Sequence, residues 1–261
     1  MNLPTSFRLD GRVAVVIGGT GALGSRIAEA LADAGAATVI VGRDAAHGDA
    51  ALGRLRDGAR EVTFEACDAS VRSALRSLLE RILAAHGHVD VLVNGAGTNS
   101  ATPFLEIADD EMERIVSINQ LAVMRACQEF GRYFVGRAAS SGQGASIVNI
   151  GSASALTPLS QVFTYSMTKA AVHNLTKSLA REWGPLGIRC NVLVPGFFPA
   201  EQNRTILTRE RTAAIMRQTP MGRFGEVGEL AGAALLLASD AGRFITGAEL
   251  VVDGGFSAMT I

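Results

Sequence analysis

Three side chains near the middle of the chain have the types and the spacing needed for proton transfer. Tyr165 and Lys169 lie four residues apart at the start of a helical pattern, and Ser152 precedes the tyrosine by thirteen residues. Positions i and i+4 share one face of a helix, so the phenol and the ammonium should project into the same space. A neighbouring ammonium favours the phenolate and lowers the tyrosine pKa from about 10. The pattern predicts that Tyr165 is a general acid and base, but a packed tyrosine followed by a solvated lysine would look the same.

The charged residues and the cysteines indicate which kinds of partner the protein lacks. The 261 residues carry 24 basic and 25 acidic side chains in alternation, which gives no basic field for nucleic acid or for an anionic membrane. Cys67, Cys127 and Cys190 are far apart and lack metal-ligand spacing, so we expect reduced, buried thiols and no metal site. The first ten residues hold no apolar run of the secretory type. We therefore expect a cytoplasmic protein that acts on a small molecule, without a membrane segment.

A glycine-rich turn directly follows the first predicted strand. The strand is the β-branched run at residues 12–17, and helical spacing of apolar residues begins after Ser25. Glycines let the backbone approach a pyrophosphate, and a helix N-terminus presents free amides to the anion. The order strand, turn, helix therefore predicts a dinucleotide site. Its residues are Gly18, Thr20, Gly21, Leu23 and Gly24.

Strand and helix patterns alternate from this turn to the end of the chain. This alternation predicts an α/β fold of the Rossmann type, with a doubly wound parallel sheet of about seven strands and helices on both faces. No linker or repeat interrupts it, so residues 1–261 should form one domain. We expect one continuous helix from Asp109, as its N-cap, to about Arg137, then a polar loop at residues 138–144. Residues 197–218 should form a substrate-covering loop with a helix.

The choice between NAD and NADP depends on the end of the second predicted strand. An acid there would accept from the ribose 2′-hydroxyl of NAD, and Asp44 could do so; Arg43 could instead pair with the 2′-phosphate of NADP. Gly42 fills the position where an acid would exclude phosphate. NADP(H) is therefore favoured and NAD(H) stays possible, as does an Arg43–Asp44 pair that is merely solvated.

Further candidates for the cofactor site follow the other strands. Asp68 could accept from the adenine amino group or cap the helix that starts near Ser70. Asn119 lies in the middle of a predicted helix and is either exposed or holding a kink and a water. Small residues after a strand suggest a backbone lying against the cofactor. These residues are Asn94, Gly95, Ala96 and Gly97, and we assign Pro195 and Gly196, at the end of another strand, to the same site.

These motifs occur in one order and at one set of spacings, and together the chain resembles the short-chain dehydrogenase/reductase family. The resemblance implies that Ser152 holds the substrate oxygen and that Tyr165 exchanges a proton with it. It also implies that Lys169 lowers the tyrosine pKa and binds the nicotinamide ribose. Gly18 and Gly24 would hold the pyrophosphate, Asp68 the adenine and Asn119 a relay water, while Asn94 would stabilise the sheet beside the cofactor. Ala22 and Ile17 depart from the family's middle glycine and leading threonine.

The resemblance also points to a substrate class. The runs at residues 195–204, 220–225 and 252–257 look like a branch of mannonate, fructuronate and gluconate 5-dehydrogenase-like enzymes, which implies a sugar acid or polyol. Within it, Gln202, Asn203 and Arg204 could address hydroxyls and a carboxylate. A 3-oxoacyl-thioester reductase and a non-catalytic dinucleotide-binding sensor are the alternatives. The family resemblance implies a homotetramer, built partly on the stripe from Ala171 to Trp183.

Overall fold

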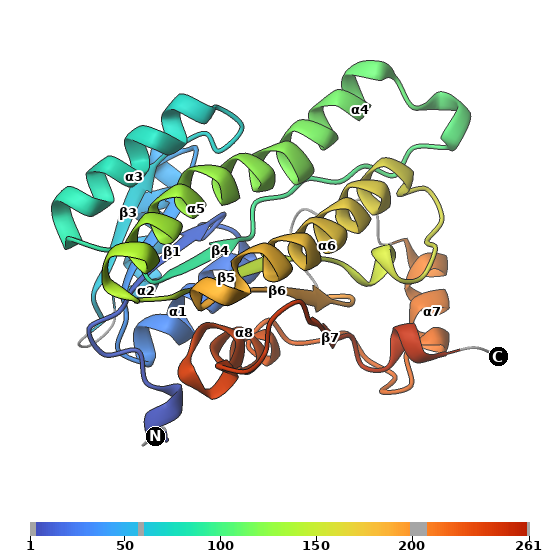
Figure 1. Ribbon diagram of the computed structural model, residues 1–261. Coiled ribbons are helices and arrows are strands. Elements are labelled where there is room, and N and C mark those ends of the chain that lie inside the picture. Colours follow the sequence, from blue (N-terminus) through green and yellow to red (C-terminus); the bar gives the residue numbers. More distant parts are fainter. Residues whose placement is uncertain (1–3, 57–59, 199–207, 260–261) are drawn as a thin grey trace.

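The structure is a computed structural model that describes residues 4–56, 60–198 and 208–259 (Figure 1). Its centre is a sheet of seven strands, all parallel, in the order β3-β2-β1-β4-β5-β6-β7. The order reverses between β1 and β4, as expected of a doubly wound sheet. The predicted fold class is confirmed. The strands are β1 (Val13–Ile17), β2 (Ala37–Gly42), β3 (Val62–Ala66), β4 (Val91–Asn94), β5 (Ala145–Ile150), β6 (Ile188–Pro195) and β7 (Glu249–Val252).

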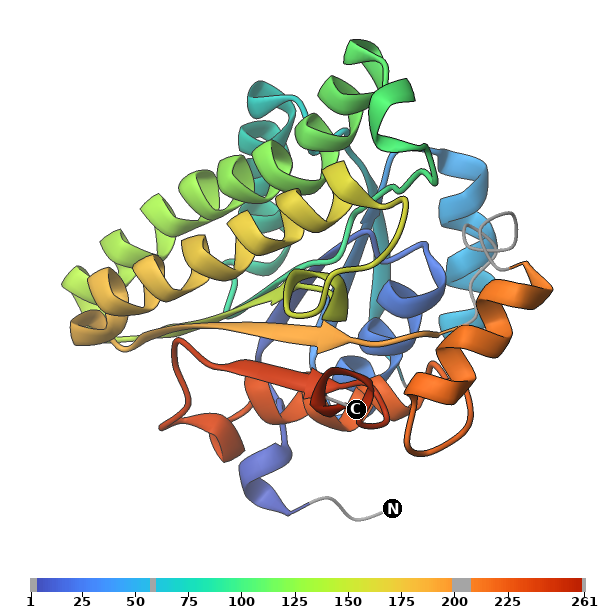
Figure 2. The same ribbon diagram turned by 90° about the vertical axis from the view of Figure 1, so that its right-hand side faces the viewer.

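Helices cover both faces of the sheet (Figures 1 and 2). One apolar layer joins α3, α5 and α6 to one face, and a second joins α1, α2 and α8 to the other. Among the described residues, no helix has the length and apolarity to cross a membrane. The helices are α1 (Ala22–Asp33), α2 (Ala45–Leu55), α3 (Arg72–His86), α4 (Asp109–Val116), α5 (Ala122–Ser141), α6 (Phe163–Trp183), α7 (Arg209–Gln218) and α8 (Glu229–Ala238).

Strand β1 explains why the core has two layers. All five of its residues are buried, and its β-branched side chains suit a strand covered on both faces. Side chains alternate along a strand. Accordingly, Val13, Val15 and Ile17 pack into the layer of α3, α5 and α6, whereas Ala14 and Val16 pack under α1 and α8.

The predicted continuous helix from Asp109 to Arg137 is wrong in three details. Ala108, and not Asp109, is the N-cap. A π-helical turn at Ser117–Leu121 separates α4 from α5. Helix α5 then runs on to Ser141, through part of the segment predicted as a loop, because its end is set by Gly142 in the left-handed region (φ 70°), whose N–H bonds the carbonyl of Ala138.

Candidate active site

A cleft of about 460 Å³ opens at the carboxyl ends of the strands, beside the point where the strand order reverses. This is where open α/β sheets bind their ligands. The structure brings most of the predicted site residues to its walls. They are Gly18, Thr20, Gly21, Leu23, Gly24, Arg43, Asp68, Gly95, Ala96, Gly97, Ser152, Tyr165, Lys169, Pro195 and Gly196. Asn94 and Asn119 are buried behind the walls, and Gln202, Asn203 and Arg204 lie outside the described residues.

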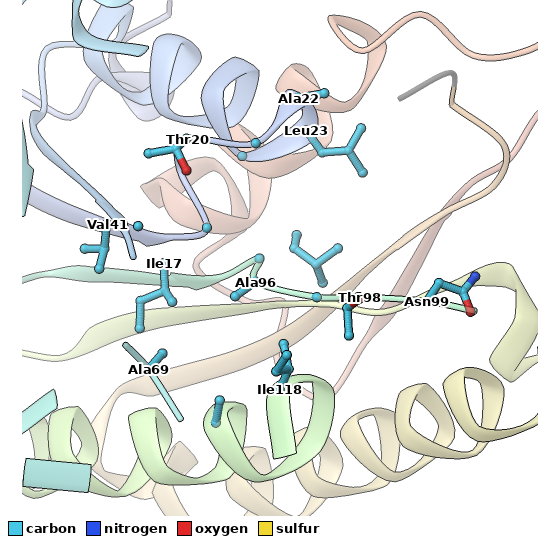
Figure 3. Close-up of a pocket in the computed structure, with 18 of the residues that line it drawn as sticks. Ile17, Thr20, Ala22, Leu23, Val41, Ala69, Ala96, Thr98, Asn99 and Ile118 are labelled. Carbon is cyan, nitrogen blue, oxygen red and sulfur yellow. The ribbon is translucent and has the colours of Figure 1, made fainter. Parts of the chain in front are cut away.

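Two glycines of the turn, Gly18 and Gly24, are packed too closely to carry side chains, whereas Thr20, Ala22 and Leu23 of the same segment do carry them (Figure 3). Gly18 has φ +82°, and a Cβ there would lie 2.6 Å from the backbone nitrogen of Ala96. A Cβ on Gly24 would lie 2.2 Å from the carbonyl oxygen of Gly18. Ala22 already belongs to the first turn of α1, a conformation that alanine adopts freely, so this departure from the family motif is accommodated. A dinucleotide pyrophosphate fits a cradle of this kind, with the N-terminus of α1 facing it.

The residues at the end of β2 bear on the choice between NAD and NADP. Asp44 is the N-cap of α2, accepting from the backbone nitrogen of His47 at 2.8 Å, and it does not line the cleft. Gly42 faces Thr20 so closely that a Cβ would meet its side chain at 2.8 Å. Arg43 lines the cleft, and no ion pair joins it to Asp44 or to any other residue in the part of the chain the structure describes. At the end of β2 itself, Arg43 and not an acid lines the cleft.

Asp68 lines the same end of the cleft but does not cap a helix. Its carboxylate accepts from the backbone nitrogen and the hydroxyl of Ser70, at 2.9 and 2.7 Å. These bonds, the Ser70 hydroxyl first, lower the pKa of Asp68, and Arg43 adds a smaller effect in the same direction. The N-cap of α3 is Val71, so the predicted capping role of Asp68 is wrong.

The three groups predicted to transfer a proton meet at the other end of the cleft. Ser152 lies two residues past the end of β5, and Tyr165 and Lys169 lie one turn apart near the start of α6. Ser152 and Tyr165 both line the cleft, and the serine hydroxyl is close enough to lower the pKa of the phenol. The ammonium of Lys169 donates to the carbonyl oxygen of Ile150 at 2.8 Å and lies 5.7 Å from the centroid of the Tyr165 ring. The strand end thus places the serine, and the helix places the other two beside it.

Burial sets the electrostatics of this group. It raises the pKa of Tyr165, and the hydrogen bond with Ser152 opposes that rise. It also lowers the pKa of Lys169 to about 8, and no carboxylate among the described residues compensates the buried ammonium. In the protein alone, burial governs the direction of the Tyr165 pKa, and the lowering of that pKa by Lys169 stays a prediction.

Asn119 is fully buried in the π-helical turn, which decides against the exposed alternative. Its amide clamps the backbone of Thr98: Oδ1 accepts from the Thr98 nitrogen and Nδ2 donates to the Thr98 oxygen, both at 2.8 Å. Nδ2 also lies 3.4 Å from the hydroxyl of Thr168 on α6. Asn119 thereby fixes the loop after β4 against the catalytic helix.

Comparison with known proteins places the cleft in a family. A family model described as enoyl-(acyl carrier protein) reductase matches residues 19–257. A galactitol 2-dehydrogenase (L-tagatose-forming) from Cereibacter sphaeroides is 37% identical, covering 98% of this chain and 99% of that protein. The chain belongs to the short-chain dehydrogenase/reductase family. The predicted resemblance is confirmed, and the protein is an NAD(P)-dependent oxidoreductase that interconverts a secondary alcohol and a ketone.

Other members of the short-chain dehydrogenase/reductase family share the sugar-acid chemistry predicted from the sequence. The gluconate 5-dehydrogenase of Gluconobacter oxydans is 34% identical, with 98% of this chain and 99% of that protein covered. A gluconate 5-dehydrogenase from Burkholderia cenocepacia, solved in complex with NADP and tartrate, is 33% identical with a TM-score of 0.92, again over 98% and 99% of the two chains.

Sequence reasoning missed two buried polar groups that support the catalytic residues. Ser154, which is 5% exposed, approaches the Ser152 hydroxyl oxygen with its backbone nitrogen at 3.2 Å and its own hydroxyl at 3.0 Å. Asn149 accepts from Asn94 and donates to the Thr176 hydroxyl, both at 2.8 Å, which ties β4 and β5 to α6. The run Ser-Ala-Ser could have suggested the first. The second depends on strand order, and no local signal gives it.

Proposed function

We propose that this protein is an NADP(H)-dependent dehydrogenase/reductase that acts on a polyol or a sugar acid. The observation that carries the proposal is the single cleft that joins two sites. One end has the glycine cradle with Arg43, which forms no ion pair among the described residues, while Asp44 at the same strand end faces away from the cleft as the cap of α2. The other end has Ser152, Tyr165 and Lys169 within one turn of α6 and one strand end.

Each of the predicted residues in the cleft has a separate role in the proposed reaction. When bound, the nicotinamide supplies or accepts the hydride. Ser152 and Tyr165 provide two hydrogen-bond donors for the substrate oxygen, and Tyr165 gives or takes its proton at the phenolic oxygen. Lys169, held at 2.8 Å from the Ile150 carbonyl, keeps a positive charge next to the phenol and would bind the nicotinamide ribose. Gly18, Gly24 and the N-terminus of α1 would hold the pyrophosphate.

The cofactor preference rests on Arg43. A guanidinium suits bidentate binding of a phosphate, and Gly42 puts no carboxylate against it. The NADP bound by the gluconate 5-dehydrogenase of Burkholderia cenocepacia supports the same choice for this chain. We therefore infer that NADP(H) binds more tightly than NAD(H).

The substrate class rests on the relatives, which are named for galactitol, D-threitol and gluconate. These compounds share a secondary hydroxyl flanked by further hydroxyls. Gln202, Asn203 and Arg204 remain predicted substrate residues. The description of the matching family model as an enoyl-(acyl carrier protein) reductase keeps thioester chemistry as the second candidate. A non-catalytic sensor is disfavoured, because the three proton-transfer residues are all present and adjacent.

A homotetramer in the cytoplasm completes the proposal. The stripe predicted as part of the subunit interface mostly packs inward, since Leu175, Leu179 and Trp183 contact the protein's own core. We assign the interface instead to exposed apolar side chains around the starts of α4 and α6. They are Phe104, Leu105, Met112, Phe163 and Met167. Native mass spectrometry of the wild type and of Phe163→Ser/Met167→Ser would test this: a tetramer that falls apart in the variant is expected.

A substrate panel tests the catalytic proposal. It should contain galactitol, threitol, gluconate, a simple secondary alcohol and a 3-oxoacyl thioester, each with both cofactors. We expect turnover to be fastest with a polyhydroxylated compound and NADP(H). In Tyr165→Phe we expect a loss of at least about 100-fold in kcat with unchanged cofactor binding. Preferred turnover of the thioester, or a Tyr165→Phe variant with wild-type kcat, would overturn the proposal.

A further inference from the structure

The loop that follows β4 enters the cleft at its catalytic end. Thr98 and Asn99 line the cleft together with Ser152 and Tyr165. In Figure 3, Thr98 and Asn99 lie at the end of the cleft opposite to Val41 and Thr20, and the Asn99 amide is drawn at the outer end of this row. Asn99 therefore lies where a substrate would extend away from the cofactor.

Hydrogen bonds hold this loop on both sides of Asn99. On one side, the Asn119 amide bonds both the nitrogen and the oxygen of the Thr98 backbone at 2.8 Å. On the other side, the carboxylate of Glu111 on α4 accepts from the hydroxyls of Ser100 and Thr102, at 2.7 and 2.9 Å. A loop fixed in this way presents its remaining polar group with little freedom left to lose, which favours binding.

The orientation of the Asn99 amide follows from its own contact. Its side chain faces the backbone nitrogen of Ser100 at 2.8 Å. Because a backbone nitrogen is a donor, the atom that faces it must be Oδ1, and the Nδ2 group points the other way. Among the residues that the structure describes, Nδ2 has no hydrogen-bond partner. Asn99 is half-buried, so two N–H donors are available at the edge of the cleft.

We propose that Asn99 is a specificity-determining residue whose Nδ2 group binds a hydroxyl or carboxylate oxygen of the substrate other than the reacting oxygen. The inference rests on the proposed function, because only a polyhydroxylated substrate or a sugar acid carries such an oxygen. The nearest acid of the loop, Glu111, already accepts two hydroxyls, so it is engaged in the structure of the loop. The hydroxyls of Ser100 and Thr102 are thus occupied, whereas the amide donors of Asn99 have no partner among the described residues.

Two substitutions at Asn99 distinguish binding of the substrate by its Nδ2 group from the hydrogen bond that its Oδ1 makes within the loop. Asn99→Asp keeps an oxygen acceptor for the Ser100 nitrogen but removes both donors, and Asn99→Ala removes both interactions. Asn174→Asp, at an exposed position of α6, makes the same chemical change away from the cleft. For each variant, kcat/KM would be measured with a polyol, a sugar acid and a simple secondary alcohol, together with the KM for NADP.

We expect Asn99→Ala to lower kcat/KM about tenfold for the polyol, the value of one good hydrogen bond, and to change it less than about twofold for the simple alcohol. Asn99→Asp should weaken the sugar acid further, because its carboxylate repels that of the substrate, and Asn174→Asp should match the wild type. Equal losses on all three substrates, or a raised KM for NADP alone, would refute the role of Asn99. A wild type that does not prefer polyhydroxylated substrates would refute the proposed function, and this inference with it.

Discussion

Lys169 should cost the folded protein stability, by an amount that depends on pH. Its side chain is 4% exposed, and its ammonium has one hydrogen-bond partner among the described residues, the Ile150 carbonyl. Burial lowers the pKa of Lys169 from 10.5 to about 8. Because one pKa unit corresponds to about 1.4 kcal/mol, keeping the lysine charged in the folded state costs about 3 kcal/mol.

The sign of the pH dependence follows from proton binding. Below pH 8 both the folded and the unfolded chain carry the charged lysine, and the folded state bears the full cost. Between pH 8 and 10.5 the unfolded chain still holds a proton that the folded chain has released, so stability rises with pH. The change Lys169→Met removes this titration. It also leaves the Ile150 carbonyl unpaired, at a cost of about 1–3 kcal/mol that does not vary with pH.

Urea unfolding of the wild type and Lys169→Met, at several pH values and one protein concentration, measures the effect. The free energy of unfolding of the variant minus that of the wild type should fall by about 2.5 kcal/mol between pH 7 and pH 10. Lys177→Met, at an exposed position two turns along α6, is the control and should show a much smaller change. A Lys169→Met difference that stays constant across this range would refute the argument that burial, unopposed by an acid, governs this lysine.

Three further predictions address the cofactor site, the strand end before Ser152 and the thiols. Arg43→Ala should raise the KM for NADPH by about tenfold or more and leave the KM for NADH unchanged. The control Arg54→Ala, at an exposed position of α2, should alter neither KM. Equal effects of Arg43→Ala on both cofactors would contradict the role of Arg43. Gly151→Ala should lower the free energy of unfolding by about 1–3 kcal/mol, because the alanine Cβ would lie 2.2 Å from Nε2 of His173. In urea unfolding, the double variant with His173→Ala should regain part of this loss. A double variant that regains none of it would contradict the clash. Burial raises the pKa of Cys127 to about 12, so iodoacetamide at pH 8 should label it only after unfolding, as mass spectrometry would detect.

The sequence was informative wherever chemistry depends on local spacing. Tyr165 and Lys169 share a helix face because they are four residues apart, and the turn from Gly18 to Gly24 follows a buried strand without a gap. The carboxyl ends of the strands of a parallel sheet lie on one edge, so the sequence alone assigns residues far apart in the chain to one cleft. These predictions needed only periodicity and topology.

The features that could not be predicted depend on three-dimensional burial and on backbone geometry. The only local sign of the π-helical turn at Ser117–Leu121 is Asn119, and a mid-helix asparagine could equally be exposed; the turn lets its amide reach the loop at Thr98. The direction of the Tyr165 pKa depends on desolvation, which spacing does not report. Asn99 is one polar residue among many in a loop, and its free donors become apparent only when the partners of its neighbours are known.

Helix α6 combines catalysis and folding in one element, which explains why its charged groups are costly. Tyr165, Lys169 and His173 recur every four residues along one face, and the last two are almost fully buried. His173 has a carboxylate, that of Glu249 on β7, 3.5 Å from its Nδ1, whereas Lys169 has none. A carboxylate beside Lys169 would stabilise the fold, but it would also cancel the positive charge that the phenol needs when it ionises. We therefore interpret the lack of a partner for Lys169 among the described residues as a stability cost that the proton transfer requires.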